Sequence, residues 1–323
     1  VQQMPKQAVK FENVDRLWRA MMDTAHDIPE VMDAVRQKNM HENLKASNKM
    51  LEEVQRDLEE YLNTKRAAFA RFYFLSNDEL LSILSQTKEV LAVQQHLNKC
   101  FEGIQELHFT PEYLVTQMQS PENEVVVLNH PINPIGEEGK PRNVEIWLAE
   151  LEKLMRSTIK TTILKCAEDY HQQDRALWLD DWPSQDILAI NQLIWTSRTE
   201  SAIEHRNLET LWNEEKEKLN ETLELIEGTR DRNKKILLET LVVLDVHNKD
   251  IIEELRKQDV RSESAFEWLA QLRYYIQEDA VKNQQLFLRM INTERVYGYE
   301  YLGNQPRLVI TPLTDRCYRT LMD

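Results

Sequence analysis

The acidic pair Asp180 and Asp181 is the first candidate for a metal site, because carboxylate oxygens are the ligands that Ca²⁺ and Mg²⁺ prefer. No third acidic residue stands at ligand spacing, so a helix-terminus or solvent-facing role is the better interpretation. The eight histidines include no i, i+4 pair, which is the spacing of a helical zinc site. Cys100, Cys166 and Cys317 form neither a metal knuckle nor a disulfide framework. We therefore predict no metal site and a reducing compartment.

The sequence also lacks the motifs of phosphate and acyl chemistry. It contains no G-x-x-x-x-G-K-[ST], G-x-G-x-x-G, H-E-x-x-H or G-x-S-x-G. Glycine occurs only 6 times in 323 residues, which disfavours Gly-rich phosphate loops, propellers and sandwiches. These absences predict no catalytic residues, and they favour an interaction or mechanical element over a self-contained enzyme.

The net charge of the chain bears on its possible partners. The net charge is −15, which disfavours nucleic acid and anionic membranes. We interpret the small basic cluster of Arg230, Arg232, Lys234 and Lys235 as a solvated face. The richest apolar stretch, residues 236–246, is about half a membrane span. We expect a soluble chain without a signal peptide, and both ends resemble cuts in a longer protein.

The first third of the chain has the periodicity of helices. Residues 11–38 predict one or two helices with a shared buried face of Phe11, Val14, Leu17, Trp18 and Met21. Residues 40–66 predict one long helix with heptad-like positions at Leu44, Leu51, Val54, Leu58 and Tyr61. Packing in a bundle is the preferred interpretation, and a coiled-coil dimer is the alternative, because the seam lasts only about three heptads.

Two capping boxes mark predicted helix starts. In such a box the first residue accepts a hydrogen bond from an amide three positions on, and the acidic side chain there reaches back. Ser76 with Glu79 predicts a helix from Asn77, and Ser264 with Glu267 predicts another.

Helical periodicity resumes after residue 143. One stripe contains Trp147, Leu151, Leu154, Met155, Ile159 and Cys166. A long helix is predicted from Ile187 toward Ile226, where Gly228 can end it. A further helix is predicted over residues 234–256.

Alternating patterns predict small β inserts near 107–128 and 272–302. The Pro/Gly-dense loop 129–142 is the best internal boundary. The predicted fold is therefore mainly α, an elongated array of helical bundles with two β-hairpin inserts. Its predicted parts are a helical bundle with a hairpin over 1–128, the loop, a second set of bundles over 143–303, and a separate segment over 304–323.

Two stretches carry a resemblance to a known family. One is Tyr297-Gly298-Tyr299-Glu300-Tyr301-Leu302-Gly303-Asn304 with the following Arg307 to Tyr318, and the other is Arg71 to Thr87. The first resembles the junction at which a dynein heavy chain passes from its linker into its first AAA+ module, and the second resembles the central linker. The residues of the first stretch are more similar to those of axonemal heavy chains, in particular the single-headed inner-arm group, than to those of the cytoplasmic form.

The resemblance implies a mechanical function. In dyneins the linker is a helical arm that changes shape as the AAA+ ring binds and hydrolyses ATP, and it drives movement along microtubules. The implied partners are the AAA+ ring of the same heavy chain, the microtubule and other dynein subunits, in the cytoskeleton of the ciliary axoneme. ATP and Mg²⁺ are implied for the full-length protein, and none for this chain, which should have no ATPase of its own.

Individual residues follow from the same resemblance. Leu308, Val309, Ile310, Thr311 and Pro312 resemble the segment on the adenine side of the nucleotide. Ring docking is a hypothesis, with core packing as the preferred alternative, for Phe72, Tyr73, Trp178 and Trp182. Candidate joints of the arm are the loop 129–142 and the helical run 195–232. The competing function is a helical scaffold or adaptor without motor activity.

Overall fold

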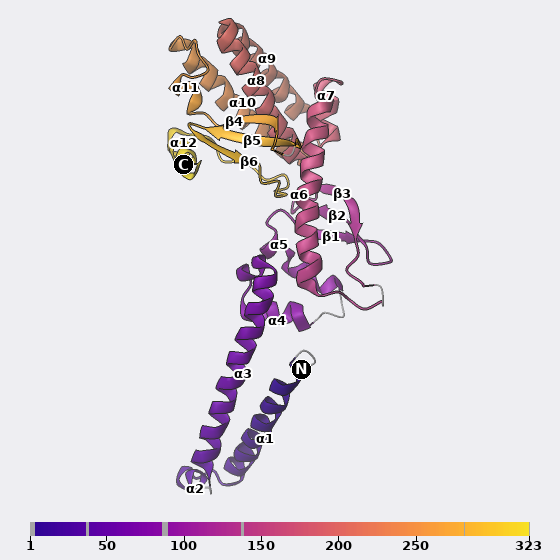
Figure 1. Ribbon diagram of the computed structural model, residues 1–323, viewed down its shortest axis with the longest axis vertical. Helices are drawn as coiled ribbons and strands as arrows, with labels where there is room; N and C mark the ends of the chain where they lie inside the picture. Colours follow the sequence, from indigo (N-terminus) through magenta and orange to yellow (C-terminus); the bar gives the residue numbers. More distant parts are fainter. Residues whose placement is uncertain (1–3, 37–38, 86–89, 137–138, 281, 323) are drawn as a thin grey trace. The chain divides into compact units, whose positions relative to one another are not determined.

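The computed structural model describes residues 4–36, 39–85, 90–136, 139–280 and 282–322 (Figure 1). The predicted helices of 11–38, the predicted loop 129–142 and the predicted terminal segment 304–323 each include one or two residues outside these ranges. The chain forms two compact units, residues 1–85 and 86–323, so the predicted boundary loop lies within the second unit.

The first unit is helical. Its elements are α1 (Pro5–Asp27), α2 (Val31–Val35), α3 (Met40–Ala68), the 3-10 helix η1 (Ala70–Phe74) and α4 (Asn77–Ser85). The predicted long helix is thus confirmed as α3. Helices α1 and α3 run antiparallel (Figure 1). Two side-chain bonds show this direction: Gln7 bonds to Asp57 at 3.2 Å, and Lys10, further along α1, bonds to Glu53, earlier in α3, at 3.0 Å.

The predicted buried face of α1 is only partly correct. Val14 and Met21 are buried, whereas Phe11 and Trp18 are 55% and 52% exposed. Leu51 of α3 is also 38% exposed. The reason is geometric: a helix that packs on one other helix buries a narrow seam, and the rest of a broad apolar stripe remains at the surface.

The capping box at Ser76 is confirmed. The Ser76 hydroxyl accepts from the Glu79 amide at 3.3 Å, and the Glu79 carboxylate accepts from the Ser76 amide at 2.9 Å. The helix starts at Asn77, as predicted, and buries Leu80, Ile83 and Leu84.

Ser76→Ala should therefore destabilise α4 by about 1 kcal/mol. The Glu79 amide loses its hydroxyl acceptor, and the bond from the Ser76 amide to the Glu79 carboxylate loses the reciprocal bond that supports it. Hydrogen exchange of the first amides of α4 measures the effect, with roughly fivefold faster exchange expected at that energy. Ser82→Ala within the same helix is the control and should be neutral or slightly stabilising, since alanine has the higher helix propensity. Equal exchange in both variants would contradict the prediction.

The second unit opens with a short helical stretch and a sheet. Its elements are η2 (Val90–His96), α5 (Leu97–Cys100), β1 (Glu106–Phe109), β2 (Val115–Gln119) and β3 (Val125–Ile132). The strands pair antiparallel in the order β1-β2-β3, with Leu107 opposite Met118 and Met118 opposite Val126. The predicted β insert is confirmed with one strand more than a hairpin. Its last strand reaches Ile132, into the range predicted as loop.

Helix α6 (Val144–Asp169) packs on β3. The predicted stripe is confirmed: its six residues from Trp147 to Cys166 are all less than 5% exposed. Continuous burial of this face holds the first sheet to the helical part of the unit.

Four helices follow: α7 (Arg175–Asp181), α8 (Ser184–His205), α9 (Leu208–Gly228) and α10 (Arg232–Lys257). The prediction of one helix from Ile187 toward Ile226 is wrong, because the chain turns between α8 and α9. Arg206 has a φ of 57°, and the Asn207 amide donates to the Ala202 carbonyl at 3.0 Å. This is the usual left-handed helix end, at a residue other than glycine. Gly228 ends α9, as predicted.

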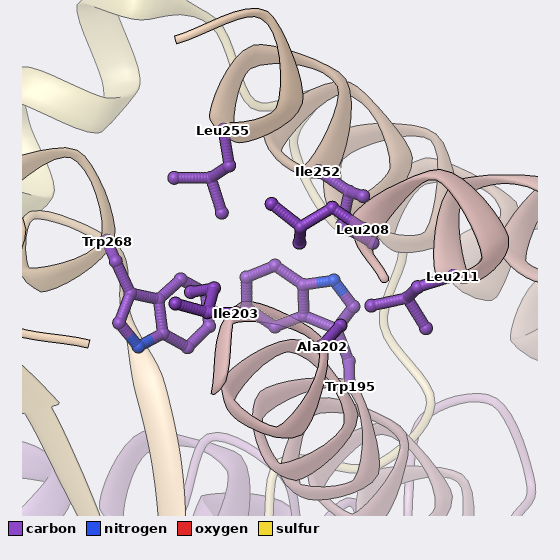
Figure 2. Packing of buried hydrophobic residues seen from close by; sticks show 8 residues of the cluster. All are labelled: Trp195, Ala202, Ile203, Leu208, Leu211, Ile252, Leu255 and Trp268. Carbon is purple, nitrogen blue, oxygen red and sulfur yellow. The ribbon is translucent and has the colours of Figure 1, made fainter. Parts of the chain in front are cut away.

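A hydrophobic cluster explains this turn (Figure 2). Its buried members are Trp195, Ala202 and Ile203 from α8, Leu208 and Leu211 from α9, Ile252 and Leu255 from α10, and Trp268. The Trp195 and Trp268 rings lie 5.3 Å apart between centroids. A continuous helix would carry Leu208 and Leu211 away from this core, so burial of apolar surface favours the turn.

The chain continues with α11 (Phe266–Leu269), the strands β4 (Arg273–Glu278), β5 (Gln284–Met290) and β6 (Thr293–Val296), and α12 (Pro312–Met322). The strands form a second antiparallel sheet in sequence order, which confirms the predicted β insert, again with one strand more than a hairpin. The capping box at Ser264 is wrong: Ala265 holds the N-cap position without a side-chain bond, and Ser264 bonds to Ser262. The pairing of β6 ends before residue 297, so residues 297–302 are not a strand.

Candidate functional site: the junction segment

Residues 297–304, here called the junction segment, leave the second sheet and are held by side chains. The last ladder-like bond runs from the Tyr297 amide to the Leu286 carbonyl at 2.9 Å. The Tyr299 hydroxyl accepts from the Leu286 amide at 2.7 Å. Burial raises the pKa of Tyr297, Tyr299 and Tyr301 above the ordinary value, so all three hydroxyls remain neutral at physiological pH. They act as fixed hydrogen-bonding groups.

Helix α8 contacts this segment through Gln185. The amide nitrogen of Gln185 donates to the Tyr297 hydroxyl and to the Glu300 carbonyl, both at 2.8 Å. Its amide oxygen accepts from the Leu302 backbone N–H at 2.8 Å. Gln185 is only 2% exposed, so its end of these bonds is shielded from water, whereas Leu302 is 41% exposed. The Glu300 carbonyl and the Leu302 N–H are the two backbone groups that one residue of a neighbouring parallel strand would bond. The side-chain amide of Gln185 bonds to them instead.

The turn between β2 and β3 supplies a second contact through Glu124. The carboxylate of Glu124 accepts from the Tyr301 hydroxyl at 3.0 Å and from the Ser184 amide at 2.8 Å. Ser184 is the first residue of α8, where free amides and the helix dipole favour a negative charge. Glu124 therefore joins the first sheet, α8 and the junction segment.

Two glycines allow the close approach of backbones at this point. A Cβ at Gly103 would lie 2.1 Å from the Tyr301 carbonyl oxygen. Gly303 has a φ of 66°, and a Cβ there would lie 2.6 Å from the Cβ of Ser120. Asn304 adds a bond of 2.7 Å to the Asn233 carbonyl near the start of α10. Five separate segments thus contact the junction segment: β5, α8, the β2–β3 turn, the stretch around Gly103 and the start of α10.

Asp186 lies beside Gln185 and is 0% exposed. Burial raises its pKa to about 8; the Thr162 hydroxyl opposes the shift, and the Glu124 carboxylate adds to it. Because the folded-state pKa lies above the unfolded one, the stability that this group confers is complete in acid and is lost as the pH rises through about 8.

Between pH 5 and pH 8 we expect Asp186→Asn to gain about 4 kcal/mol of stability relative to the wild type, because the buried wild-type carboxyl must keep a proton that the amide does not need. Denaturant unfolding at the two pH values measures this. Asp181→Asn, at an exposed position, is the control and should follow the wild type. Parallel pH profiles of all three proteins would contradict the prediction.

The predicted adenine-side residues lie just beyond the junction segment. Leu308 and Val309 are 75% and 65% exposed, and Pro312 begins α12. Leu308 and Ile310 line a cavity of about 370 Å³, whose other walls include Leu188 of α8 and Leu244 of α10. The remaining residues of the predicted strip do not line it. The structure brings part of this strip to a cavity, and its contact with a nucleotide remains a prediction.

The predicted docking aromatics divide into two groups. Phe72 and Trp178 are at most 1% exposed, and the Trp178 indole donates to the Cys166 carbonyl at 3.1 Å, as core packing predicts. Tyr73 is 66% exposed. Trp182 is partly buried and donates to the Asp169 carboxylate at 2.9 Å. Docking on the AAA+ ring remains a prediction. Of these four residues only Tyr73 is largely exposed, and the Arg66 guanidinium lies 5.9 Å from the centroid of its aromatic ring.

The acidic pair behaves as a helix terminus. Asp181 ends α7 and accepts from Gln173 at 3.2 Å, while Asp180 pairs with Lys234 of the basic cluster. Among the described residues, no three His, Cys, Asp or Glu side chains lie together as metal ligands would. No described helix combines the length and the apolar character needed to cross a membrane.

Comparison with known families gives these observations a context. Residues 1–166 match the family model "Dynein heavy chain, N-terminal region 2". Residues 297–323 match the model "Hydrolytic ATP binding site of dynein motor region". The two matches identify the class of motor heavy chains and place the junction segment at the start of the region that matches the ATP-binding model. The chain belongs to the dynein heavy chain family.

Individual proteins similar to this chain support the same family. The chain is 42% identical over 322 residues to dynein axonemal heavy chain 3 of Mus musculus, covering 100% of this chain and 8% of that protein. It is 42% identical over 321 residues to dynein axonemal heavy chain 1 of Homo sapiens, covering 99% and 7%. For dynein axonemal heavy chain 12 of Homo sapiens the identity is 42% over 324 residues, covering 100% and 10%. The chain spans a tenth or less of these relatives, and the predicted axonemal resemblance is confirmed.

Proposed function

We propose that this chain is the mechanical linker of a dynein-type, ATP-driven microtubule motor. The linker would act as a lever arm whose shape follows the nucleotide state of the adjoining AAA+ ring and which produces ciliary movement. The proposal places the protein in the cytoskeleton of the axoneme. Its partners would be the AAA+ ring of the same heavy chain, the microtubule through the complete motor, and other dynein subunits.

The observation that carries the proposal is the enclosure of the junction segment. A lever arm can move with its motor only if the chain that connects them is fixed at both ends. Residues 297–304 lie where the match to the ATP-binding region begins, and Gln185, Glu124 and Asn304 join them to α8, the first sheet and α10. A movement that starts beyond residue 304 would therefore reach the helices directly.

In the full-length protein we propose that Leu308 to Pro312 contribute an apolar wall to the adenine side of an ATP site. An exposed apolar strip suits the face of a purine. The phosphates and Mg²⁺ would be bound by a phosphate loop, which this sequence does not contain. The strip would thus report on nucleotide binding without performing hydrolysis.

A lever arm also needs a joint between two stable arrangements. The candidates are the loop 129–142 and the run 195–232, in which α8 and α9 meet at Arg206. The cluster around Trp195 and Leu208 packs both sides of this corner. Hydrogen exchange from residue 187 to 226 tests the second candidate: faster exchange near residue 206 is expected for a joint there, and uniform protection contradicts it.

The test of the function is a distance measurement in the full-length heavy chain. A donor dye at the exposed Glu217 of α9 and an acceptor on the AAA+ ring should change their energy transfer between the ATP-bound and nucleotide-free states. A heavy chain with a disabled phosphate loop is the control and should show no change. Identical transfer in both states of the active motor would refute the lever arm and favour the scaffold.

A further inference from the structure

We propose that Gln185 is the positioning residue that couples the junction segment to the helical arm. This inference rests on the proposed function and names the side chain through which movement would pass. Gln185 stands at the second residue of α8 and bonds to three groups of one short segment: the Tyr297 hydroxyl, the Glu300 carbonyl and the Leu302 N–H.

The chemistry of this site requires an amide of the length of glutamine. Two of the three groups accept hydrogen bonds and one donates, so the side chain must supply two N–H bonds and one acceptor. A primary amide does both at once, whereas a carboxylate only accepts and an ammonium only donates. Gln185 itself is only 2% exposed, so removal of its amide takes from three groups of the junction segment a partner that water replaces poorly.

The location of Gln185 connects the segment to the core. Helix α8 has 22 residues, and it carries Gln185 at its start and Trp195, Ala202 and Ile203 of the hydrophobic cluster further along. A helix of this length spans about 33 Å and moves as a stiff rod. A displacement of Glu300 or Leu302 would therefore move the far end of α8, together with α9 and α10, which pack in the same cluster.

Glu124 supports the same geometry from a second direction. Its carboxylate bonds to the Ser184 amide next to Gln185 and to the Tyr301 hydroxyl, between the two backbone groups that Gln185 holds. The Gln185 amide thus holds the residues on either side of Tyr301, Glu300 and Leu302, and the Glu124 carboxylate holds the Tyr301 side chain. Because Tyr301 is 0% exposed, the segment has little room to slide without breaking one of these bonds.

The test compares Gln185→Met with Gln192→Met in the full-length heavy chain. Gln192 lies on the same helix, is buried, and has an amide nitrogen without a hydrogen-bond partner among the described residues, so it matches Gln185 in size and burial. In Gln185→Met we expect at least tenfold faster hydrogen exchange of the Leu302 amide. ATP turnover should stay within twofold of the wild type, whereas microtubule gliding velocity should fall at least fivefold. Gln192→Met should resemble the wild type in all three measurements.

The outcomes separate the inference from the proposed function. Unchanged exchange of Leu302 in Gln185→Met would overturn the inference, and so would faster exchange with unchanged gliding velocity. A wild-type heavy chain that hydrolyses ATP but never moves microtubules would refute the proposed function, even if the Leu302 amide responds as expected. If Gln185→Met does not fold, Gln185→Asn keeps the amide with a shorter reach, and the same outcomes apply to it.

Discussion

Replacing Asp245 with alanine is expected to lower the free energy of unfolding of residues 86–323 by about 3–5 kcal/mol, because it removes one partner of a buried ion pair. Asp245 is 0% exposed on α10. Its carboxylate accepts from Lys218 of α9 at 3.2 Å and from Asn191 of α8 at 2.9 Å. Arg175 of α7 approaches it at 3.7 Å. Without the carboxylate, Arg175 and Lys218 each lose an ionic partner at a site with little access to water, and Lys218 keeps the Glu215 carboxylate at 3.4 Å.

Denaturant unfolding measures the change in the free energy of unfolding, and two further variants serve as controls. Asp250→Ala removes an exposed carboxylate of the same helix and should change stability by less than about 0.5 kcal/mol. The double variant Asp245→Leu/Lys218→Met removes both charges and should recover part of the loss, since apolar residues often replace buried pairs at little cost. A loss below about 1 kcal/mol for Asp245→Ala would show that this carboxylate is not a structural centre.

The second large effect is expected for Gly103→Ala, which should cost about 3 kcal/mol, the upper end of the range for overpacking. The added Cβ would lie 2.1 Å from the Tyr301 carbonyl oxygen, 2.7 Å from its carbonyl carbon and 2.9 Å from the Leu302 Cα. All three are backbone atoms, so no side-chain rotation relieves the contact. The junction segment itself must move away from Gln185 and Glu124.

Gly298→Ala provides the matched control for this substitution. It lies in the same segment, and a Cβ there would meet no atom within 4 Å. Alanine at that position should be neutral or stabilise by a few tenths of a kcal/mol, through the lower entropy of the unfolded chain. Thermal or denaturant unfolding compares the two variants. Equal stabilities would mean that the backbones near Gly103 and Tyr301 are less closely packed than described.

Local signals predicted the local structure. The stripe of α6 and the capping box at Ser76 each depend on residues within one or two helical turns, and both are confirmed. The break at Arg206 was not predictable in this way, because no glycine or proline marks it and the cluster around Trp195 decides it. The box at Ser264 fails for the converse reason: the four-residue helix α11 starts later and is held by the burial of Trp268.

The sequence indicated part of the candidate site. The tyrosine-rich junction segment and the strip from Leu308 stood out through their resemblance to a family, which the comparisons confirm. The residues that hold the segment did not, since Gln185 lies 117 positions before Leu302 and Glu124 lies 177 positions before Tyr301. Pairings at such separations leave no periodic or local signal in a single sequence.

The bond between Glu124 and Tyr301 has a consequence during protein synthesis. A ribosome that adds about 5–20 residues per second needs roughly 9–35 s to pass from one residue to the other. During that interval the β2–β3 turn, and from residue 184 onward the first turn of α8, are present without the tyrosines that later cover them. The nascent chain therefore completes this part of its structure late, and a pause in translation before residue 301 prolongs the time in which chaperones can bind there.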